Sequence, residues 1–230
     1  MNRISYHLTL LLVFFVPEIS IRLVAQSSLR QAQDRPNVVI ILADDLGIGD
    51  VSAYNENAAW QTPNIDRLAA TGMSFTDAHT SAAICTPTRY GIITGRYNWR
   101  STRKSGGGDG YSTPLIKNER TTIAELFKEQ GYHTALIGKW HLGWNWKLKS
   151  SRKIRYDSKT LPDIDFSQAI ENGPQKHGFM YSFGTTASLS SPPFVWIENS
   201  LPTSIPSQIS VNYDEKAFWR KGPKAEDFNH

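Results

Sequence analysis

Four stretches of the chain carry the hydrophobic pattern of β-strands. Residues 37–42 consist of Asn37 and then a continuous run of β-branched and leucine side chains, typical of a strand buried on both faces of a parallel sheet. Apolar and polar residues alternate over residues 73–78, and residues 132–138 are also strand-like. A fourth strand is expected in the second half of residues 190–199. We therefore expect one strand in each of these four stretches.

A short helix is predicted between the first two strands. Residues 62–72 begin with Thr62 as a cap and Pro63 in the first turn, and Gly72 ends the helix. Its buried face is expected to consist of three residues at helical spacing: Ile65, Leu68 and Ala69.

A second helix is predicted before the strand at residues 132–138. Residues 122–125 read Thr-Ile-Ala-Glu, a capping box in which Thr122 and Glu125 satisfy each other's backbone N–H groups. The helix is expected to run through Gln130 and to end at Gly131. Helices that alternate with strands in this way indicate an α/β fold.

Two long segments lack a regular apolar pattern. Residues 97–111 contain basic side chains and the three glycines 106–108, but no Gly-Lys-Thr/Ser follows, so we interpret this segment as a flexible surface loop. Residues 144–176 are polar and basic, and we expect them to form an excursion on the surface.

Composition narrows the class of protein. The 230 residues are enough for one domain, or for part of a larger one, and 40% of them are hydrophobic, as in globular proteins. A net charge of +4 from scattered basic residues argues against a nucleic-acid partner. A single cysteine excludes an internal disulfide.

The N-terminus resembles a secretory signal. Arg3 precedes an apolar run over residues 8–16, which is too short to span a bilayer comfortably, and Ala25 follows at an imperfect cleavage site. We predict a signal peptide at residues 1–25, a polar linker at 26–35 and export to the periplasm or the outside of the cell. The only membrane contact would be through this segment, and an uncleaved anchor is the alternative.

The single cysteine lies in a marked setting. Pro87 suits the first turn of a helix, so Cys85 is expected at a helix N-terminus, where backbone N–H groups favour an anion. Arg89 follows about one turn later on the same face and suits sulfate or phosphate. The alternatives are a small buried thiol in a capped helix, and a cysteine-phosphatase loop, which normally has five residues between Cys and Arg, whereas this chain has three.

Charged residues follow two of the predicted strands. Asp44 and Asp45 come directly after residues 37–42, where two carboxylates suit a hard divalent cation. Lys139 and His141 follow residues 132–138 and, at a period of two, point to the same side. In the alternative interpretation, one of the two aspartates caps the next turn and the other is solvated. Lys139 would then be a solvated residue at a strand end, and His141 a hydrogen-bonded core histidine.

These motifs together resemble the type I, formylglycine-dependent sulfatases of the arylsulfatase kind. Residues 85–96 match their signature Cys-x-Pro-x-Arg-x4-Thr-Gly-Arg, residues 138–143 match Gly-Lys-Trp-His-Leu-Gly, and residues 62–68 match Thr-Pro-Asn-Ile-Asp-x-Leu. The resemblance covers residues 36–199 well. Because sulfatases are about twice this long, the chain looks like an N-terminal part.

The resemblance implies a fold and a set of site residues. The fold would be alkaline-phosphatase-like, a mostly parallel central sheet flanked by helices, incomplete at the C-terminus, over residues 36–230. A formylglycine-generating enzyme would convert Cys85 to Cα-formylglycine, and Ca²⁺ would bind the residues Asp44, Asp45 and Cys85. The other catalytic or substrate-binding residues would be Arg89, Lys139, His141 and Ser188. The sequence departs from the pattern before Ser188, where Met180 takes the place of an aspartate.

The same resemblance implies a reaction. It predicts a sulfuric ester hydrolase that acts on sulfated carbohydrates or aryl sulfates through a covalent enzyme sulfate ester. One alternative is a phosphate or phosphonate ester hydrolase of the same superfamily. The other is a catalytically incomplete protein. In the family, the second half supplies another histidine, an Asp-Asn pair and a second sulfate-binding lysine, and no counterpart of these is recognisable after His141.

Overall fold

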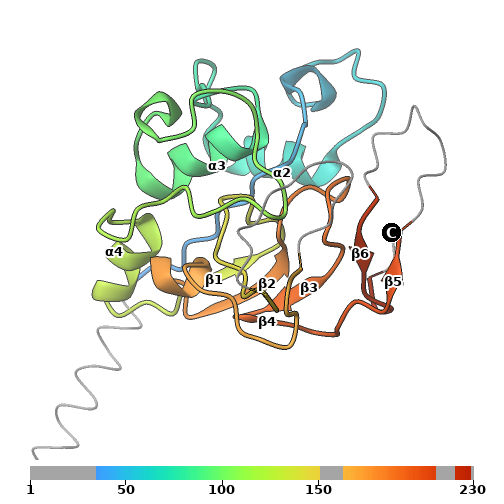
Figure 1. Ribbon diagram of the computed structural model, residues 1–230. Helices are drawn as coiled ribbons and strands as arrows, with labels where there is room; N and C mark the ends of the chain where they lie inside the picture. Colours follow the sequence, from blue (N-terminus) through green and yellow to red (C-terminus); the bar gives the residue numbers. More distant parts are fainter. Residues whose placement is uncertain (1–34, 151–162, 211–220, 229–230) are drawn as a thin grey trace, which may run out of the picture. The chain divides into compact units, whose positions relative to one another are not determined.

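A computed structural model of the protein describes residues 35–150, 163–210 and 221–228 (Figure 1). The predicted signal peptide, and all of the predicted linker except its last residue, lie outside these ranges. The chain divides into two units, one ending at Ala43 and one beginning at Asp44. No helix in the described ranges is both long enough and apolar enough to cross a bilayer.

In the first unit, the predicted buried strand at residues 37–42 is not a strand. These residues belong to no sheet of the described residues, and Val39 and Ile41 are 80% and 82% exposed. A buried strand needs hydrogen-bonded neighbours on both edges and packing on both faces, which the run does not find here.

The second unit contains a four-stranded sheet in the order β1-β2-β3-β4. Strands β1 (Ala135–Ile137) and β2 (Tyr181–Thr185) pair in parallel, whereas β3 (Trp196–Glu198) and β4 (Leu201–Pro202) continue the sheet antiparallel. A separate antiparallel pair is formed by β5 (Gln208–Ile209) and β6 (Pro223–Lys224). The sheet of the described residues is therefore mixed, with one parallel pair, where the sequence predicted a mostly parallel one.

The three α-helices precede the sheet in the chain and run from cyan to yellow-green in Figure 1, with the strands in yellow to red. They are α2 (Pro63–Thr71), α3 (Cys85–Thr94) and α4 (Ile123–Glu129), with short 3-10 turns η1 (Ile48–Asp50), η2 (Asn98–Arg100) and η3 (Pro174–His177). The three α-helices lie where their end signals predicted.

Two predictions around α2 are wrong. Ile65 and Leu68 of the expected buried face are 38% and 64% exposed. Residues 73–78 form no strand, and their side chains are exposed. The apolar spacing suits a helix at α2 and a strand at residues 73–78. The described residues, however, offer no surface against which these apolar side chains could be buried.

The hydrophobic core lies in the second unit and includes a segment that we expected at the surface. Trp144 and Trp146 are 3% and 6% exposed, and their rings meet edge to face at 5.5 Å. Ile164 and Ile170 are also buried in this core. The described parts of residues 144–176 thus contribute side chains to the hydrophobic core, because the burial of a few large aromatic rings outweighs the polar character of their many neighbours.

The capping box of α4 also connects this helix to His177 at the end of η3. The Thr122 hydroxyl accepts from the Glu125 N–H at 3.2 Å and donates to the His177 carbonyl at 2.7 Å, and Thr122 is 1% exposed. The Glu125 carboxylate accepts from the Thr122 N–H at 2.8 Å. One hydroxyl therefore stabilises both the helix end and a long-range contact.

Removing that hydroxyl is expected to destabilise the fold. We predict that Thr122→Ala lowers the free energy of unfolding by about 1–2 kcal/mol, because the helix loses its cap and the His177 carbonyl its donor. Urea unfolding followed by circular dichroism measures this. Thr122→Ser keeps the hydroxyl and serves as the control; an alanine variant as stable as the serine variant would contradict the prediction.

Candidate active site

The site is built around the first turn of α3. The helix begins at Cys85, after Ile84 in extended conformation, and the Thr88 N–H donates to the Ile84 carbonyl at 3.1 Å. Pro87 occupies the first turn, where a missing N–H costs nothing. The helix ends at Gly95, whose φ of 63° is left-handed. The predicted position of Cys85 at a helix N-terminus is confirmed, and its thiol is half-buried.

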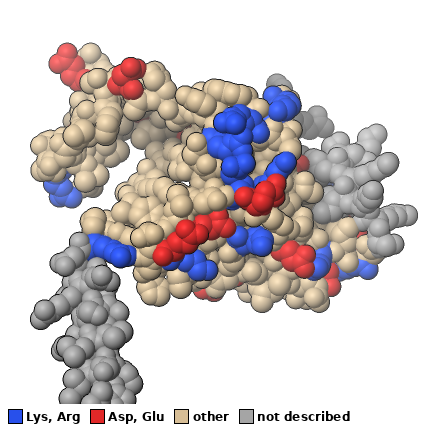
Figure 2. All heavy atoms as spheres, turned by 90° about the vertical axis from the view of Figure 1, so that its left-hand side faces the viewer, with Lys and Arg blue, Asp and Glu red and all other residues tan. Residues whose placement is uncertain are grey.

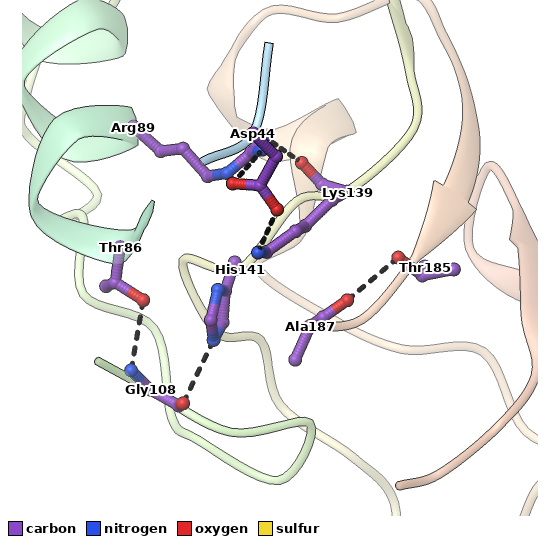
Figure 3. Close-up of polar contacts among 8 residues, drawn as sticks. All are labelled: Asp44, Thr86, Arg89, Gly108, Lys139, His141, Thr185 and Ala187. Carbon is purple, nitrogen blue, oxygen red and sulfur yellow. Dashed lines mark hydrogen bonds and ion pairs between the residues drawn. The ribbon is translucent and has the colours of Figure 1, made fainter. Parts of the chain in front are cut away.

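Arg89, Lys139 and Asp44 meet although they come from three distant segments (Figure 3). Lys139 Nζ lies 2.5 Å from Asp44 Oδ2, and Arg89 Nη2 lies 3.5 Å from Asp44 Oδ1. Arg89 Nη1 also donates to the Lys139 carbonyl at 2.5 Å. One carboxylate therefore lies between two cations, so the cluster keeps a net positive charge.

The charges in this cluster change the pKa of Asp44. Burial alone raises the pKa of the carboxyl, but the hydrogen bond from Lys139 and the positive charges of Lys139 and Arg89 outweigh it and lower the pKa below its usual value. The two cations are nearly buried, with side chains 13% and 14% exposed, whereas the carboxylate is 40% exposed. Asp44 is therefore ionised at neutral pH.

Lys139 and His141 leave the sheet together. The chain turns at Gly138, whose φ is 104°, and the Trp140 and His141 N–H groups donate to the carbonyls of Thr185 and Thr186. A β-carbon on Gly184 would lie 1.7 Å from the Gly138 carbonyl oxygen, so only glycine permits this approach of β2. These backbone contacts thus fix the backbone positions from which the side chains of Lys139 and His141 extend.

The imidazole of His141 is buried and neutral. The residue is 4% exposed, and its Nε2 lies 2.9 Å from the Gly108 carbonyl oxygen. Burial is the main cause that lowers the pKa of His141 to about 4; the Gly108 hydrogen bond opposes this, and the charges of Lys139 and Arg89 lower the pKa further. Nδ1 is buried and has no hydrogen-bond partner within the described ranges.

The segment of three glycines at residues 106–108, here called the glycine loop, lies against this site, and the sequence did not predict this contact. A β-carbon placed on Gly107 would lie 3.9 Å from Cys85 Sγ, 3.9 Å from His141 Cε1 and 3.6 Å from Thr86 Oγ1. The thiol and the imidazole therefore border one small space beside Gly107. A run of glycines on its own indicates only a loop, and the Gly-Lys-Thr/Ser of a phosphate-binding loop does not follow it.

Asp45 and Ser188 lie near these elements along the chain. Asp45 is exposed and has a φ of 60°. Ser188 follows Ala187 after β2 and is half-buried, and its carbonyl accepts from the Ser191 N–H at 2.9 Å. Within the described ranges, no three His, Cys, Asp or Glu side chains are grouped to hold a metal ion. The roles that the resemblance implies for Asp45 and Ser188 stay predictions.

The buried histidine gives the fold a pH dependence. The pKa of His141 is about 4 in the folded chain and about 6.5 when unfolded, so between these values only the unfolded chain binds the proton. Stability is therefore expected to fall as the pH drops from about 6.5 to about 4. Urea midpoints measured across this range test the prediction.

His141→Gln is the matched variant for that experiment. It should flatten the pH dependence in part, because burial also lowers the pKa of His177, which contributes in the same direction. A variant with the full pH dependence of the parent chain would contradict the prediction.

The chain is similar in sequence to known proteins. The sequence pattern of the family described as Sulfatase matches residues 36–199. The chain is 38% identical over 188 residues to N-acetylgalactosamine-6-O-sulfatase of Bacteroides thetaiotaomicron, covering 81% of this chain and 34% of that protein. It is 41% identical over 158 residues to human steryl-sulfatase, covering 66% of this chain and 24% of that protein.

A solved structure is similar as well. It comes from work on the metabolism of multiple glycosaminoglycans by Bacteroides thetaiotaomicron, with a TM-score of 0.63 and 38% identity, and the match covers 80% of this chain and 35% of that one. The chain thus spans about a quarter to a third of the length of the curated relatives it matches.

Proposed function

The chain belongs to the sulfatase family, and on that premise we propose that it forms part of a sulfuric ester hydrolase whose nucleophile derives from Cys85. The observation that carries the proposal is the meeting of Arg89, Lys139 and Asp44 in one cluster. A net positive cluster one helical turn from the thiol suits an anionic sulfate ester.

The nucleophile requires a modification of Cys85 that the family implies. A formylglycine-generating enzyme would oxidise the side chain to an aldehyde, whose hydrate supplies the attacking hydroxyl. The half-buried thiol at the start of α3, beside the space at Gly107, fits such a group. Backbone N–H groups at the helix N-terminus would favour its partial negative charge.

The chain's own side chains have distinct roles in this proposal. Arg89 and Lys139 hold the sulfate and offset the charge that develops as the bond between sulfur and the leaving oxygen breaks. His141 is neutral, so its Nδ1 can accept a proton from a group at residue 85. Ser188 is proposed to line the substrate pocket.

Calcium is the second group that the family implies. Carboxylate oxygens suit Ca²⁺, so Asp44 and Asp45 would hold it, together with an oxygen of the modified residue 85. Two carboxylates supply at most four oxygens, fewer than the roughly six to eight that Ca²⁺ takes. Both Asp44 oxygens also face cations. The described residues thus fit part of a calcium site only.

Sulfated carbohydrates are the proposed substrates, with aryl sulfates as simple analogues. The relative from Bacteroides thetaiotaomicron is named for a 6-O-sulfated amino sugar, and the human relative for steryl sulfates. We also propose that the chain is exported, which agrees with the apolar run at residues 8–16.

Coexpression with a formylglycine-generating enzyme tests the proposal. Conversion of Cys85 exchanges sulfur and two hydrogens for one oxygen, which intact-mass analysis detects. Initial rates on 4-nitrophenyl sulfate and 4-nitrophenyl phosphate should then differ by at least about tenfold in favour of the sulfate. Faster phosphate turnover would indicate the phosphate-ester alternative, and conversion without any turnover would indicate a non-catalytic protein; either result contradicts the proposal.

A further inference from the structure

The backbone of Gly108 is held by buried side chains at its N–H and at its carbonyl oxygen, which belong to two successive peptide groups (Figure 3). Its N–H donates to Thr86 Oγ1 at 3.0 Å, and its carbonyl oxygen lies 2.9 Å from His141 Nε2. Thr86 and His141 are 1% and 4% exposed. Thr86 is the residue next to the nucleophile, so this chain of hydrogen bonds connects the first turn of α3 to the imidazole.

These contacts determine where the proton on His141 lies. A carbonyl oxygen only accepts hydrogen bonds, so Nε2 must carry the proton. Because the ring is neutral at pH 7, Nδ1 then carries a lone pair. That nitrogen is buried, and no partner for it lies in the described part of the chain. A buried acceptor without a partner costs stability, which points to a group that binds there.

The loop is also fixed beside the thiol. Arg103 Nη1 donates to the Gly107 carbonyl at 3.1 Å, so both glycines have a side-chain partner. The β-carbon position of Gly107 lies 3.9 Å from both Cys85 Sγ and His141 Cε1. The glycine loop therefore borders the same space as the nucleophile and the imidazole.

We propose that Thr86 and the Gly107–Gly108 backbone are positioning groups that hold His141 with its proton on Nε2 and present Nδ1 to the group at residue 85. This assignment rests on the proposed function for its catalytic meaning. The hydrogen-bond chain itself can be tested on the unmodified protein. Thr86 acts through Gly108 and touches neither the substrate nor the proton that moves.

Nitrogen-15 NMR of the histidine rings at pH 7 tests the proposal without an activity assay. The signals of His141 are assigned by their loss in His141→Gln. In the parent chain we expect a protonated Nε2 and an unprotonated Nδ1. Thr86→Val removes the acceptor at nearly constant volume, and we expect a mixture of the two tautomers; Thr86→Ser should restore the single one.

The outcomes separate positioning from a structural role. A proton on Nδ1 in the parent chain would overturn the proposal even if Thr86→Val does not fold. A folded Thr86→Val variant with the parent tautomer would overturn it as well. In a preparation active on 4-nitrophenyl sulfate, Thr86→Val should lower kcat by about 10²-fold with little change in KM. If no preparation is active, the tautomer result still stands.

Discussion

Replacing Cys85 by alanine is expected to lower turnover of 4-nitrophenyl sulfate by about 10⁴-fold or more in a preparation whose residue 85 is otherwise converted. Alanine has no sulfur to oxidise, so neither the aldehyde nor its hydrate can form. The positive cluster at Arg89 and Lys139 would still bind an anion. We therefore expect the loss in kcat, which initial rates over a range of substrate concentrations measure.

The control for this variant lies in the same helix. Ile92→Val removes one methyl group from α3 without a charge, hydrogen bond or reactive atom, so it should keep turnover within a few-fold and lose about 0.5–1.5 kcal/mol of stability. If Cys85→Ala kept measurable turnover well above background, the nucleophile would lie elsewhere and the proposed function would be wrong.

Replacing Asp44 by asparagine is expected to destabilise the chain at neutral pH by about 1–3 kcal/mol, a value reduced because the carboxylate is 40% exposed. The variant leaves Arg89 and Lys139, both nearly buried, without their shared counter-ion. Since burial raises the pKa of Asp44 but Lys139 and Arg89 lower it more, the folded pKa lies below 3.8. The carboxylate's contribution is present above the unfolded pKa and is lost as pH falls through the folded one.

The direction of this pH dependence gives the Asp44→Asn experiment a second measurement. Urea midpoints of Asp44→Asn and the parent chain should differ at pH 7 and converge in acid. Glu171→Gln is the matched control, because the Lys147–Glu171 ion pair is nearly as short as the Lys139–Asp44 pair, 2.6 Å against 2.5 Å, but lies exposed. It should cost no more than about 0.5–1 kcal/mol. Equal losses for the two variants would show that burial of the cluster adds nothing.

The short motifs of the sequence predicted more than its longer patterns did. The resemblance to the sulfatases and the α/β fold class are confirmed by the family match and by the structural neighbour. The helix at Cys85 and the capping box at Thr122 also lie where the sequence placed them. These signals are local, because a cap or a proline in a first turn depends on a few neighbouring residues. The catalytic and metal-binding roles of the site residues stay predictions.

Patterns that depend on distant partners were less informative. The apolar run at residues 37–42 and the alternating residues 73–78 are exposed in the structure, because a strand exists only where another strand pairs with it. In the opposite direction, Trp144 and Trp146 are buried despite their polar surroundings. Hydropathy averaged over such a segment does not predict that two tryptophan rings pack against each other.

The surface charges agree with the scattered basic residues of the sequence. On the face shown in Figure 2, basic and acidic side chains of the described residues lie next to one another and not in separate areas. That face therefore presents no continuous surface of one sign. In the proposed function, the positive charge that binds an anionic ester comes instead from Arg89 and Lys139, which are largely hidden from solvent.

The near-contact of Gly184 with Gly138 has a consequence for reading natural variation in this protein. A single added methyl group at residue 184 would push β2 away from the turn that carries Lys139. Such a change alters no ionisable or reactive atom, yet it would move the cation by displacing its backbone. Loss-of-function alleles should therefore be sought in the scaffold's glycines as readily as among the charged groups that they support.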